Sequence, residues 1–281
     1  MNIKEVKYLL DKYNLNAKKN FGQNFLVDDN ILKKIASALN DKGYKSVIEV
    51  GPGLGSLTRY LVEMYDEVLC YEIDKDMIEV LNNTIEKNNL IIREGDFLKS
   101  DVSKDIGKFL KTNPCLIANL PYYITSPILL KLLEEVREVK DIVVMIQKEV
   151  AERFVARPNT KDYNALSVLI QYFTNAVKLF DVSPSAFVPA PKVTSAVIHL
   201  SYKEEELLTG KDLEFFLKFN RNIFKQRRKT FVNNVASSYN ISKEEAAAIL
   251  EQNGFSKTIR SEVLSVEEIV KLSLIFKEQL A

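Results

Sequence analysis

Short apolar runs rich in β-branched residues alternate with longer amphipathic segments as far as Tyr202. Seven of these runs have the length and composition of strands: Ser46–Val50, Glu67–Ile73, Leu90–Asp96, Pro114–Leu120, Asp141–Lys148, Ala176–Val182 and Thr194–Tyr202. Between the earlier runs, apolar residues recur at helical spacing in Leu57–Met64, Lys75–Lys87 and Pro127–Val136. Strands that alternate with helices predict an α/β fold, in which helices cover both faces of a mostly parallel sheet.

The last two predicted strands have no helix between them, because the connecting segment 183–192 is rich in proline. Parallel neighbours need a long crossover connection, whereas antiparallel neighbours do not. We therefore expect the sheet to end in an antiparallel hairpin on an otherwise parallel sheet.

After Tyr202 the chain changes to helical periodicity, beginning with a charged run at Lys203. We expect two domains, a sheet domain at 1–203 and a small all-α domain at 204–281. A chain of 281 residues is long enough for one large core with a small satellite.

The composition excludes several classes of protein. No apolar run reaches the length of a membrane span, and the charged N-terminal segment lacks a secretory signal. Cys70 and Cys115 lie in apolar runs, which favours buried thiols over a disulfide. With a single histidine and two cysteines, we expect no metal site. The chain is expected to be a cytoplasmic monomer without membrane contact.

A glycine-rich loop, Glu49-Val-Gly-Pro-Gly-Leu-Gly55, follows the first predicted strand and opens a helix. Its glycines let the backbone approach a ligand closely, although the spacing is not that of the dinucleotide fingerprint. Glu72 ends the next strand, roughly 20 residues on, where a carboxylate can accept the hydroxyls of a ribose. Asp96 ends the third strand, within reach of an adenine amino group. Two such acids without a diphosphate cradle favour S-adenosylmethionine over NAD, although either acid alone can be a helix cap.

The segment Asn119-Leu-Pro-Tyr-Tyr-Ile-Thr-Ser-Pro-Ile128 follows the fourth predicted strand. An open α/β sheet binds its ligands at this edge. The Asn119 side-chain oxygen and the Leu120 carbonyl can accept the two N–H groups of an adenine amine. Pro121 then fixes the turn, and Tyr122 offers a face on which the base can stack. The alternative is a proline-rich loop whose aromatic residues pack on the core.

The Asn-x-Pro-Tyr signature resembles that of methyltransferases acting on adenine N6. Four further blocks resemble the ribosomal RNA adenine N6-dimethyltransferases, and with this signature they span nearly the whole chain: Lys18–Leu26, Phe187–Ala196, Asn222–Thr230 and Arg260–Ser265. The resemblance implies a Rossmann-like class I methyltransferase sheet of seven strands, a helical RNA-binding domain and S-adenosyl-L-methionine as cofactor.

This family has two main branches. One dimethylates two adjacent adenosines near the 3′ end of small-subunit (16S) ribosomal RNA during ribosome maturation. The other modifies a large-subunit (23S) adenosine and confers macrolide resistance. Leu120, the Val-Pro-Ala-Pro-Lys-Val run and the Arg-Ser-Glu-x-Leu-Ser block resemble the first branch. The implied partner is 16S ribosomal RNA in an immature small subunit. A non-catalytic RNA-binding assembly factor is a further alternative.

The resemblance also implies roles for individual residues. The cofactor site would comprise Asn24, Leu26, Gly51, Gly53, Glu72, Ile73, Asp96, Phe97 and Asn119. The acceptor site would comprise Asn119, Leu120, Pro121 and Tyr122, with Phe187 stacking on the target base from the other side. A loop aromatic buried in the core is the alternative for Phe187.

A basic stretch without acids lies between Glu214 and Glu244. A solvated helix face would usually include acids as ion-pair partners. The predicted RNA contacts are Lys218, Arg221, Lys225 and Arg228, which recur at helical spacing, together with Lys18 and Lys19. His199 lies on an alternating strand, and we interpret it as a structural or surface residue.

Overall fold

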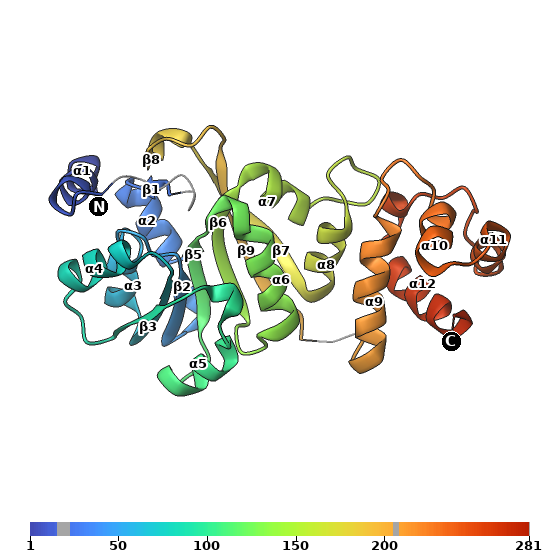
Figure 1. Cartoon of the computed structure of the whole chain (residues 1–281), viewed down its shortest axis with the longest axis horizontal. Helices are drawn as coiled ribbons and strands as arrows, with labels where there is room; N and C mark the ends of the chain where they lie inside the picture. Colours follow the sequence, from blue (N-terminus) through green and yellow to red (C-terminus); the bar gives the residue numbers. More distant parts are fainter. Residues whose placement is uncertain (16–22, 205–207, 281) are drawn as a thin grey trace. The chain divides into compact units, whose positions relative to one another are not determined.

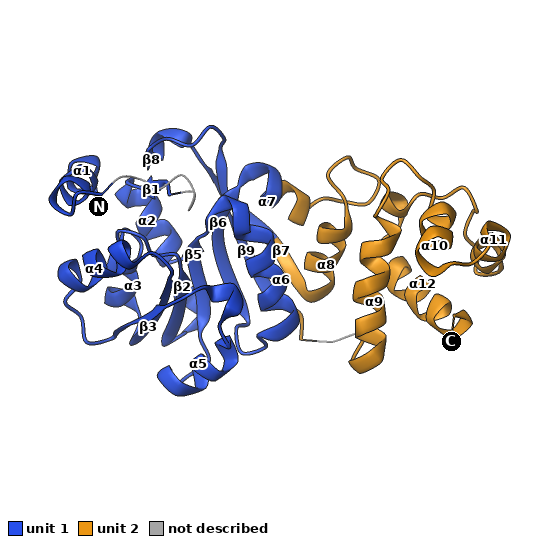
Figure 2. Ribbon diagram, in the orientation of Figure 1, with its two compact units in different colours: residues 1–151, 177–202 blue, residues 152–176, 203–281 orange. Residues whose placement is uncertain are grey.

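The computed structural model describes residues 1–15, 23–204 and 208–280, which form two compact units. Unit 1 comprises residues 1–151 and 177–202, and unit 2 comprises residues 152–176 and 203–281 (Figure 2). The chain passes between the units three times, and the third passage, at residues 202–203, lies at the expected boundary. Residues 152–176 were expected in the sheet domain, but they group with the helical unit.

All seven predicted strands are present and belong to one sheet (Figure 1). The strands are β2 (Ser46–Val50), β3 (Glu67–Glu72), β4 (Leu90–Glu94), β5 (Cys115–Asn119), β6 (Asp141–Gln147), β7 (Thr174–Val182) and β9 (Ser195–Tyr202). Their order across the sheet is β4-β3-β2-β5-β6-β9-β7. Strand β2 is parallel to β3 and β5, whereas β9 is antiparallel to β6 and lies beside β7.

The first helices of unit 1 are α1 (Ile3–Lys12), α2 (Asp29–Ala36), α3 (Thr58–Met64) and α4 (Lys75–Thr84). They are followed by α5 (Val102–Phe109), α6 (Thr125–Glu135) and α7 (Lys148–Phe154), whose last residues belong to unit 2. Short 3-10 turns follow three strands or loops: η3 (Phe97–Lys99), η4 (Tyr122–Ile124) and η5 (Pro184–Ala186). A further turn, η2 (Asn40–Lys42), precedes β2.

The central strands of the sheet are buried on both faces, whereas the edge strands β4 and β7 are partly exposed. Every residue of β2 is buried, and Val47 joins a core cluster that includes Ile35 of α2 and Leu61 of α3. Ile48, the next residue, points to the opposite face and is also fully buried. Continuous apolar runs are expected where helices cover a parallel sheet from both sides.

A second sheet of two short strands was not predicted. Strand β1 (Phe25–Leu26) pairs antiparallel with β8 (Phe187–Val188), with Leu26 opposite Phe187. Two-residue strands carry no periodic signal in the sequence. This pairing nevertheless joins the N-terminal block to the proline-rich connection between β7 and β9.

Unit 2 consists of helices together with the first residues of β7. The helices are α8 (Ala165–Phe173), α9 (Gly210–Ile223), α10 (Phe231–Tyr239), α11 (Lys243–Gln252) and α12 (Val266–Gln279), with the turn η6 (Ser261–Val263). Helix α9 packs against α8, α10 and α12. Aromatic rings fill its core, where Phe219 contacts Phe231 and Phe276.

Within the described ranges, no helix is both long and apolar enough to cross a lipid bilayer. In the same residues, no group of three or more His, Cys, Asp or Glu side chains has the geometry to hold a metal ion.

The single histidine belongs to a buried network at the start of β6. The Asp141 carboxylate accepts a hydrogen bond from the Tyr44 hydroxyl at 2.7 Å, and its other oxygen lies 2.6 Å from His199 Nε2. Burial alone would raise the pKa of the Asp141 carboxyl, but hydrogen bonds from His199 and Tyr44 outweigh it and lower that pKa. The interpretation of His199 as a structural residue therefore agrees with its position.

We expect Asp141→Asn to lower the free energy of unfolding by about 2 kcal/mol at pH 7, because hydrogen bonds to a charged group are lost. The folded-state pKa lies below the unfolded value of about 3.9, so the carboxylate contributes its stability above that pH. The contribution is lost as the pH falls through the folded-state pKa. Urea unfolding of both proteins between pH 7 and pH 3 measures this difference. A difference that stayed constant down to pH 3 would contradict the assignment.

Candidate active site

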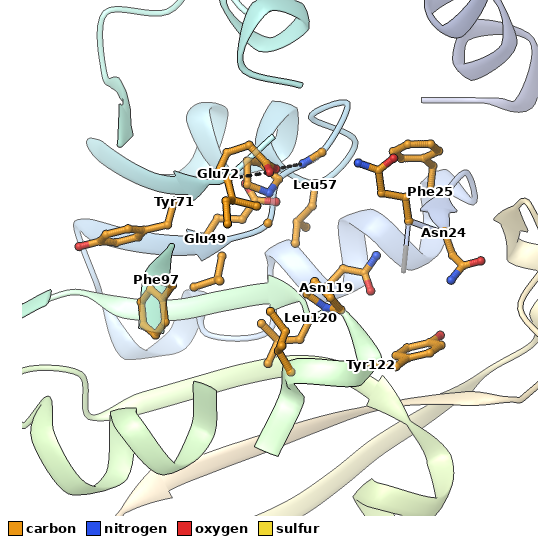
Figure 3. A pocket seen from close by; sticks show the side chains of 18 of the residues that line it. Asn24, Phe25, Glu49, Leu57, Tyr71, Glu72, Phe97, Asn119, Leu120 and Tyr122 are labelled. Carbon is orange, nitrogen blue, oxygen red and sulfur yellow. Dashed lines mark hydrogen bonds between the residues drawn. The ribbon is translucent and has the colours of Figure 1, made fainter. Parts of the chain in front are cut away.

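A cavity of about 220 Å³ opens at the carboxyl ends of β2, β3, β4 and β5. Every predicted cofactor-binding and acceptor residue lines it except Phe187. In the view of Figure 3, Tyr71 and Phe97 lie at one end of the pocket and Asn24 and Tyr122 at the other, with Asn119 between them. The structure thus brings together residues that lie far apart in the sequence.

The glycine loop contains glycines with positive φ angles, which residues with a side chain rarely adopt. Gly51 has φ +71° and Gly53 has φ +57°. The Gly51 N–H donates to the Tyr71 carbonyl at 2.9 Å, and a Cβ at Gly53 would lie 3.3 Å from the Phe25 ring. Glycine therefore keeps the loop close to β3 and β1 while its backbone faces the pocket.

Glu72 is held in place by three backbone N–H groups. Its Oε2 accepts from Gly53 at 3.1 Å, and its Oε1 accepts from Ile73 and Asp74, each at 2.9 Å. Burial raises the pKa of the Glu72 carboxyl, and the three N–H donors oppose that shift without cancelling it. Each carboxylate oxygen has more than one acceptor site, so the pinned side chain retains capacity for the hydroxyls of a ligand.

Asp96 caps the 3-10 turn that follows β4. Its Oδ1 accepts from the Leu98 N–H at 2.9 Å, and its Oδ2 lies 3.8 Å from Lys99 Nζ. The preceding residue, Gly95, donates its N–H to the Glu72 carbonyl at 2.8 Å. The two predicted cofactor carboxylates are therefore joined through the backbone, and both functions named for Asp96, helix cap and ligand acceptor, are compatible.

The segment after β5 presents two unfilled acceptors. The Leu120 N–H donates to the Met145 carbonyl at 3.1 Å, which continues the β5–β6 ladder. Within the part of the chain that the structure describes, neither the Asn119 side chain nor the Leu120 carbonyl takes part in a hydrogen bond. The Asn119 and Leu120 oxygens can together bind a donor with two N–H groups. Pro121 lies against the glycine loop, since a Cβ on Gly51 would be 3.6 Å from the Pro121 Cδ.

Tyr122 is anchored through its hydroxyl, which lies 2.5 Å from Ser195 Oγ at the start of β9. Burial raises the pKa of Tyr122, so the phenol stays neutral. Sequence reasoning missed Ser195, because only the fold brings β9 next to the turn that follows β5. The hydrogen bond fixes the ring at the edge of the pocket.

Phe187 is the one predicted acceptor residue that the structure does not place in the pocket. Its side chain is 3% exposed and belongs to the core cluster that contains Leu26, Val182 and Ala186. This position is the core alternative considered from the sequence. A role in stacking on the target base remains a prediction for Phe187, and it requires the ring to leave this cluster.

Glu49 also lines the pocket, although it was not among the predicted site residues. It is buried on β2 and accepts a hydrogen bond from the Thr58 hydroxyl at 2.7 Å. Burial raises the pKa of its carboxyl to about 7, and the negative charge of Glu72 adds to the shift. A glutamate inside a short apolar run could have indicated a functional residue, because a buried charge is costly without a partner.

The four predicted RNA-binding residues of unit 2 are exposed, but the predicted helical spacing was wrong for two of them. Lys218 and Arg221 lie on α9, whereas Lys225 and Arg228 lie on the turn after it. The helix ends because Asn234 donates to the Ile223 carbonyl at 2.8 Å and accepts from the Gln226 N–H at 3.1 Å. Lys18 and Lys19 lie outside the described residues.

The fold and the pocket define a Rossmann-like class I methyltransferase, with a glycine loop, two strand-end carboxylates and an acceptor edge after β5. Residues 14–277 match the family model described as ribosomal RNA adenine dimethylase. The chain therefore belongs to the ribosomal RNA adenine dimethylase family.

Curated relatives agree over nearly the whole chain. A protein of Lactococcus lactis named ribosomal RNA small subunit methyltransferase A is 43% identical over 97% of this chain and 94% of its own length. A Bacillus pumilus protein of the same name is 41% identical over 98% of this chain and 96% of its own length.

Two solved structures share the fold across most of the chain. A dimethyladenosine transferase from Plasmodium falciparum is 30% identical, with a TM-score of 0.75, and the match covers 91% of this chain and 98% of that one. The 23S rRNA methyltransferase ErmE is 24% identical, with a TM-score of 0.66 and coverage of 90% and 100%. At that identity, ErmE supports the fold alone.

We expect Glu72→Gln to weaken the binding of S-adenosylhomocysteine about tenfold or more, which corresponds to about 1.4 kcal/mol. Backbone N–H groups approach both oxygens of Glu72, so the amide NH₂ of glutamine must face a donor in either orientation. Calorimetric titration measures the effect. Glu79→Gln, on the exposed surface of α4, is the matched control. Equal affinities in the two variants would show that the Glu72 carboxylate is not needed.

Proposed function

We propose that this protein dimethylates the N6 amino groups of two adjacent adenosines near the 3′ end of 16S ribosomal RNA during ribosome maturation. The cofactor is S-adenosylmethionine. The observation that carries the proposal is a pair of acceptors at the edge of the pocket, the Asn119 side-chain oxygen and the Leu120 carbonyl, to which no described residue donates a hydrogen bond. The names of relatives that are 41–43% identical support the small-subunit RNA as acceptor.

The pocket residues fit the chemistry of the cofactor. The glycine loop offers close backbone approach, Glu72 offers acceptors for two ribose hydroxyls, and Asp96 offers an acceptor for the adenine amino group. Asn24 and Leu26 close the side of the pocket formed by β1. When bound, S-adenosylmethionine supplies an electrophilic methyl group on a sulfonium centre.

The acceptor residues would activate the target adenine by orientation. The adenine amine is a poor nucleophile because its lone pair is delocalised into the ring. When its two N–H groups donate to Asn119 Oδ1 and the Leu120 carbonyl, the nitrogen is drawn towards tetrahedral geometry and its lone pair is freed. The methylated aminium is acidic and loses its proton easily, so no strong base is needed. Catalysis is positioning plus electrostatics.

Dimethylation requires a second productive orientation of the same nitrogen. After the first transfer the amine retains one N–H, so only one of the two acceptors can be engaged. Pro121 and the Tyr122–Ser195 hydrogen bond hold the edge of the pocket while the base reorients. This proposal assigns Tyr122 to stacking, because its ring is fixed beside the two acceptors.

The exposed basic side chains of unit 2 suit an RNA partner. Lys218 and Arg221 extend from α9, and Lys225 and Arg228 extend from the turn that follows it. The target adenine must leave its stack to reach Asn119, which costs less in a loop than in a duplex. We propose a loop of an immature small subunit as substrate, with the protein acting as a cytoplasmic monomer.

The alternatives have weaker support. ErmE, a 23S rRNA methyltransferase among the solved structures, supports only the fold at 24% identity, whereas the small-subunit relative from Lactococcus lactis is 43% identical. A non-catalytic assembly factor would not need the complete set of cofactor carboxylates and the open acceptor pair. Glu72, Asp96 and Asn119 are all present in the pocket.

We expect Asn119→Ala to lower methyl transfer to undermethylated small subunits by about 100-fold or more, as for other lost transition-state contacts. Binding of S-adenosylhomocysteine should stay within about threefold of wild type, because Glu72 and Asp96 remain. The measurement uses labelled S-adenosylmethionine with small subunits and, separately, with large-subunit RNA. Near-full activity of the variant would refute the acceptor role of Asn119. Label confined to large-subunit RNA would refute the choice of substrate.

We expect the double change Arg221→Glu with Lys225→Glu to weaken RNA binding and to lower the salt dependence of the affinity. Each lost phosphate contact should reduce the slope of log K against log salt by about 0.7–0.9. Filter binding across a salt series measures the slope. Lys257→Glu, an exposed lysine of the same unit, is the control. A slope equal to that of wild type would show that Arg221 and Lys225 do not contact the RNA.

A further inference from the structure

Tyr123 is an aromatic residue that lines the pocket and whose side chain is exposed to solvent. The described residues include several large apolar side chains that remain exposed, and two of those line the pocket: Tyr123, 56% exposed, and Ile73, 49% exposed. Ile73 follows β3 and belongs to the predicted cofactor site. An apolar surface of this kind inside a pocket indicates contact with a ligand.

The backbone around Tyr123 is fixed in a 3-10 turn. The Ile124 N–H and the Thr125 hydroxyl both donate to the Pro121 carbonyl, at 3.2 and 3.1 Å. Successive side chains of a 3-10 helix point about 120° apart, because the helix has three residues per turn. Tyr122 is directed to Ser195, so the ring of Tyr123 is directed elsewhere along the pocket.

Tyr123 lines the same cavity as Ile73, Glu72 and Asp96, at the ends of β3 and β4. Burial raises the pKa of Tyr123, and the carboxylates of Asp96 and Glu72 raise it further. These are the two carboxylates predicted to hold the adenosine of the cofactor. Tyr123 thus shares one pocket wall with these two carboxylates, and the direction of its pKa shift agrees with that placement.

We propose that Tyr123 is a cofactor-binding residue whose ring covers the adenosine half of S-adenosylmethionine, in the same part of the pocket as Ile73. The inference rests on the proposed function and adds a residue to its cofactor site. Aromatic rings bind purines through stacking or edge contacts, without requiring the hydroxyl. Burial of the exposed ring on binding would contribute to affinity.

The local charge favours the cofactor over the RNA as occupant. Glu72 and Asp96 create negative potential at this end of the pocket, which repels a phosphodiester backbone. The adenosine of the cofactor carries no phosphate. Its hydroxyls and amino group are donors that match the two carboxylates. The RNA-stacking role thus falls to Tyr122, at the opposite end of the acceptor edge.

The test compares three variants in the absence of RNA. S-adenosylhomocysteine is titrated by calorimetry, and adenosine is titrated in competition with it. We expect Tyr123→Ala to weaken both ligands by the same factor, about tenfold, whereas Tyr123→Phe stays within about twofold of wild type. Tyr8→Ala is the matched control, because Tyr8 is 61% exposed on α1 and does not line the pocket. Thermal unfolding confirms that each variant is folded.

Other outcomes would overturn the inference in distinguishable ways. Unchanged affinity for S-adenosylhomocysteine in Tyr123→Ala, with weaker RNA binding, would place the ring against the RNA. A loss for S-adenosylhomocysteine but not for adenosine would place it against the amino-acid half. An equal loss in Tyr123→Phe would assign the effect to the hydroxyl and overturn the ring contact. Failure of the wild-type protein to bind S-adenosylhomocysteine would refute the proposed function itself, before any variant is compared.

Discussion

The Glu72 residue connects the three loops that form the cofactor end of the pocket. Its carboxylate accepts the Gly53 N–H from the loop after β2, and its carbonyl accepts the Gly95 N–H from the loop after β4. Its remaining oxygen caps the turn after β3 through Ile73 and Asp74. One buried side chain and its own peptide group therefore set the spacing of three strand ends. The same carboxylate is the predicted ribose ligand, so support of the loops and recognition of the ligand depend on one charge.

The acceptor end of the pocket follows a different principle. There the polar groups of Asn119 and Leu120 that face the pocket receive no hydrogen bond from the described residues, and their neighbours hold them in place. Pro121 packs towards Gly51, and Tyr122 is tied to Ser195. An unsatisfied acceptor in a partly buried site is costly unless a ligand completes it. The glycine loop thus serves both ends of the site, since it contacts the carboxylate of Glu72 and the proline of the acceptor turn.

Several features were predictable because they arise from local pattern. The alternation of apolar runs and amphipathic segments predicted all seven strands of the sheet, and β2 has the predicted bounds. Glu72, Asp96 and Asn119 were selected because each follows a strand, and the carboxyl ends of parallel strands share one edge. Lys225 and Arg228 were misplaced for the opposite reason. Their spacing continued the helix, but Asn234 on the next helix donates to the Ile223 carbonyl and accepts from the Gln226 N–H, and α9 ends before them.

The amino-acid sequence by itself determined the class of fold, the strand-end residues of the site and the family, because each depends on short-range periodicity or on contiguous motifs. Only the tertiary structure decided which residues face the ligand. Phe187 and Tyr123 are both aromatic residues close to prolines, yet the first is buried in the core and the second lines the pocket. Phe187 lies on β8, which pairs with the distant strand β1, and no local pattern encodes that pairing. The turn that holds Tyr123 is local, but only the fold brings it to the cavity at the ends of β3 and β4.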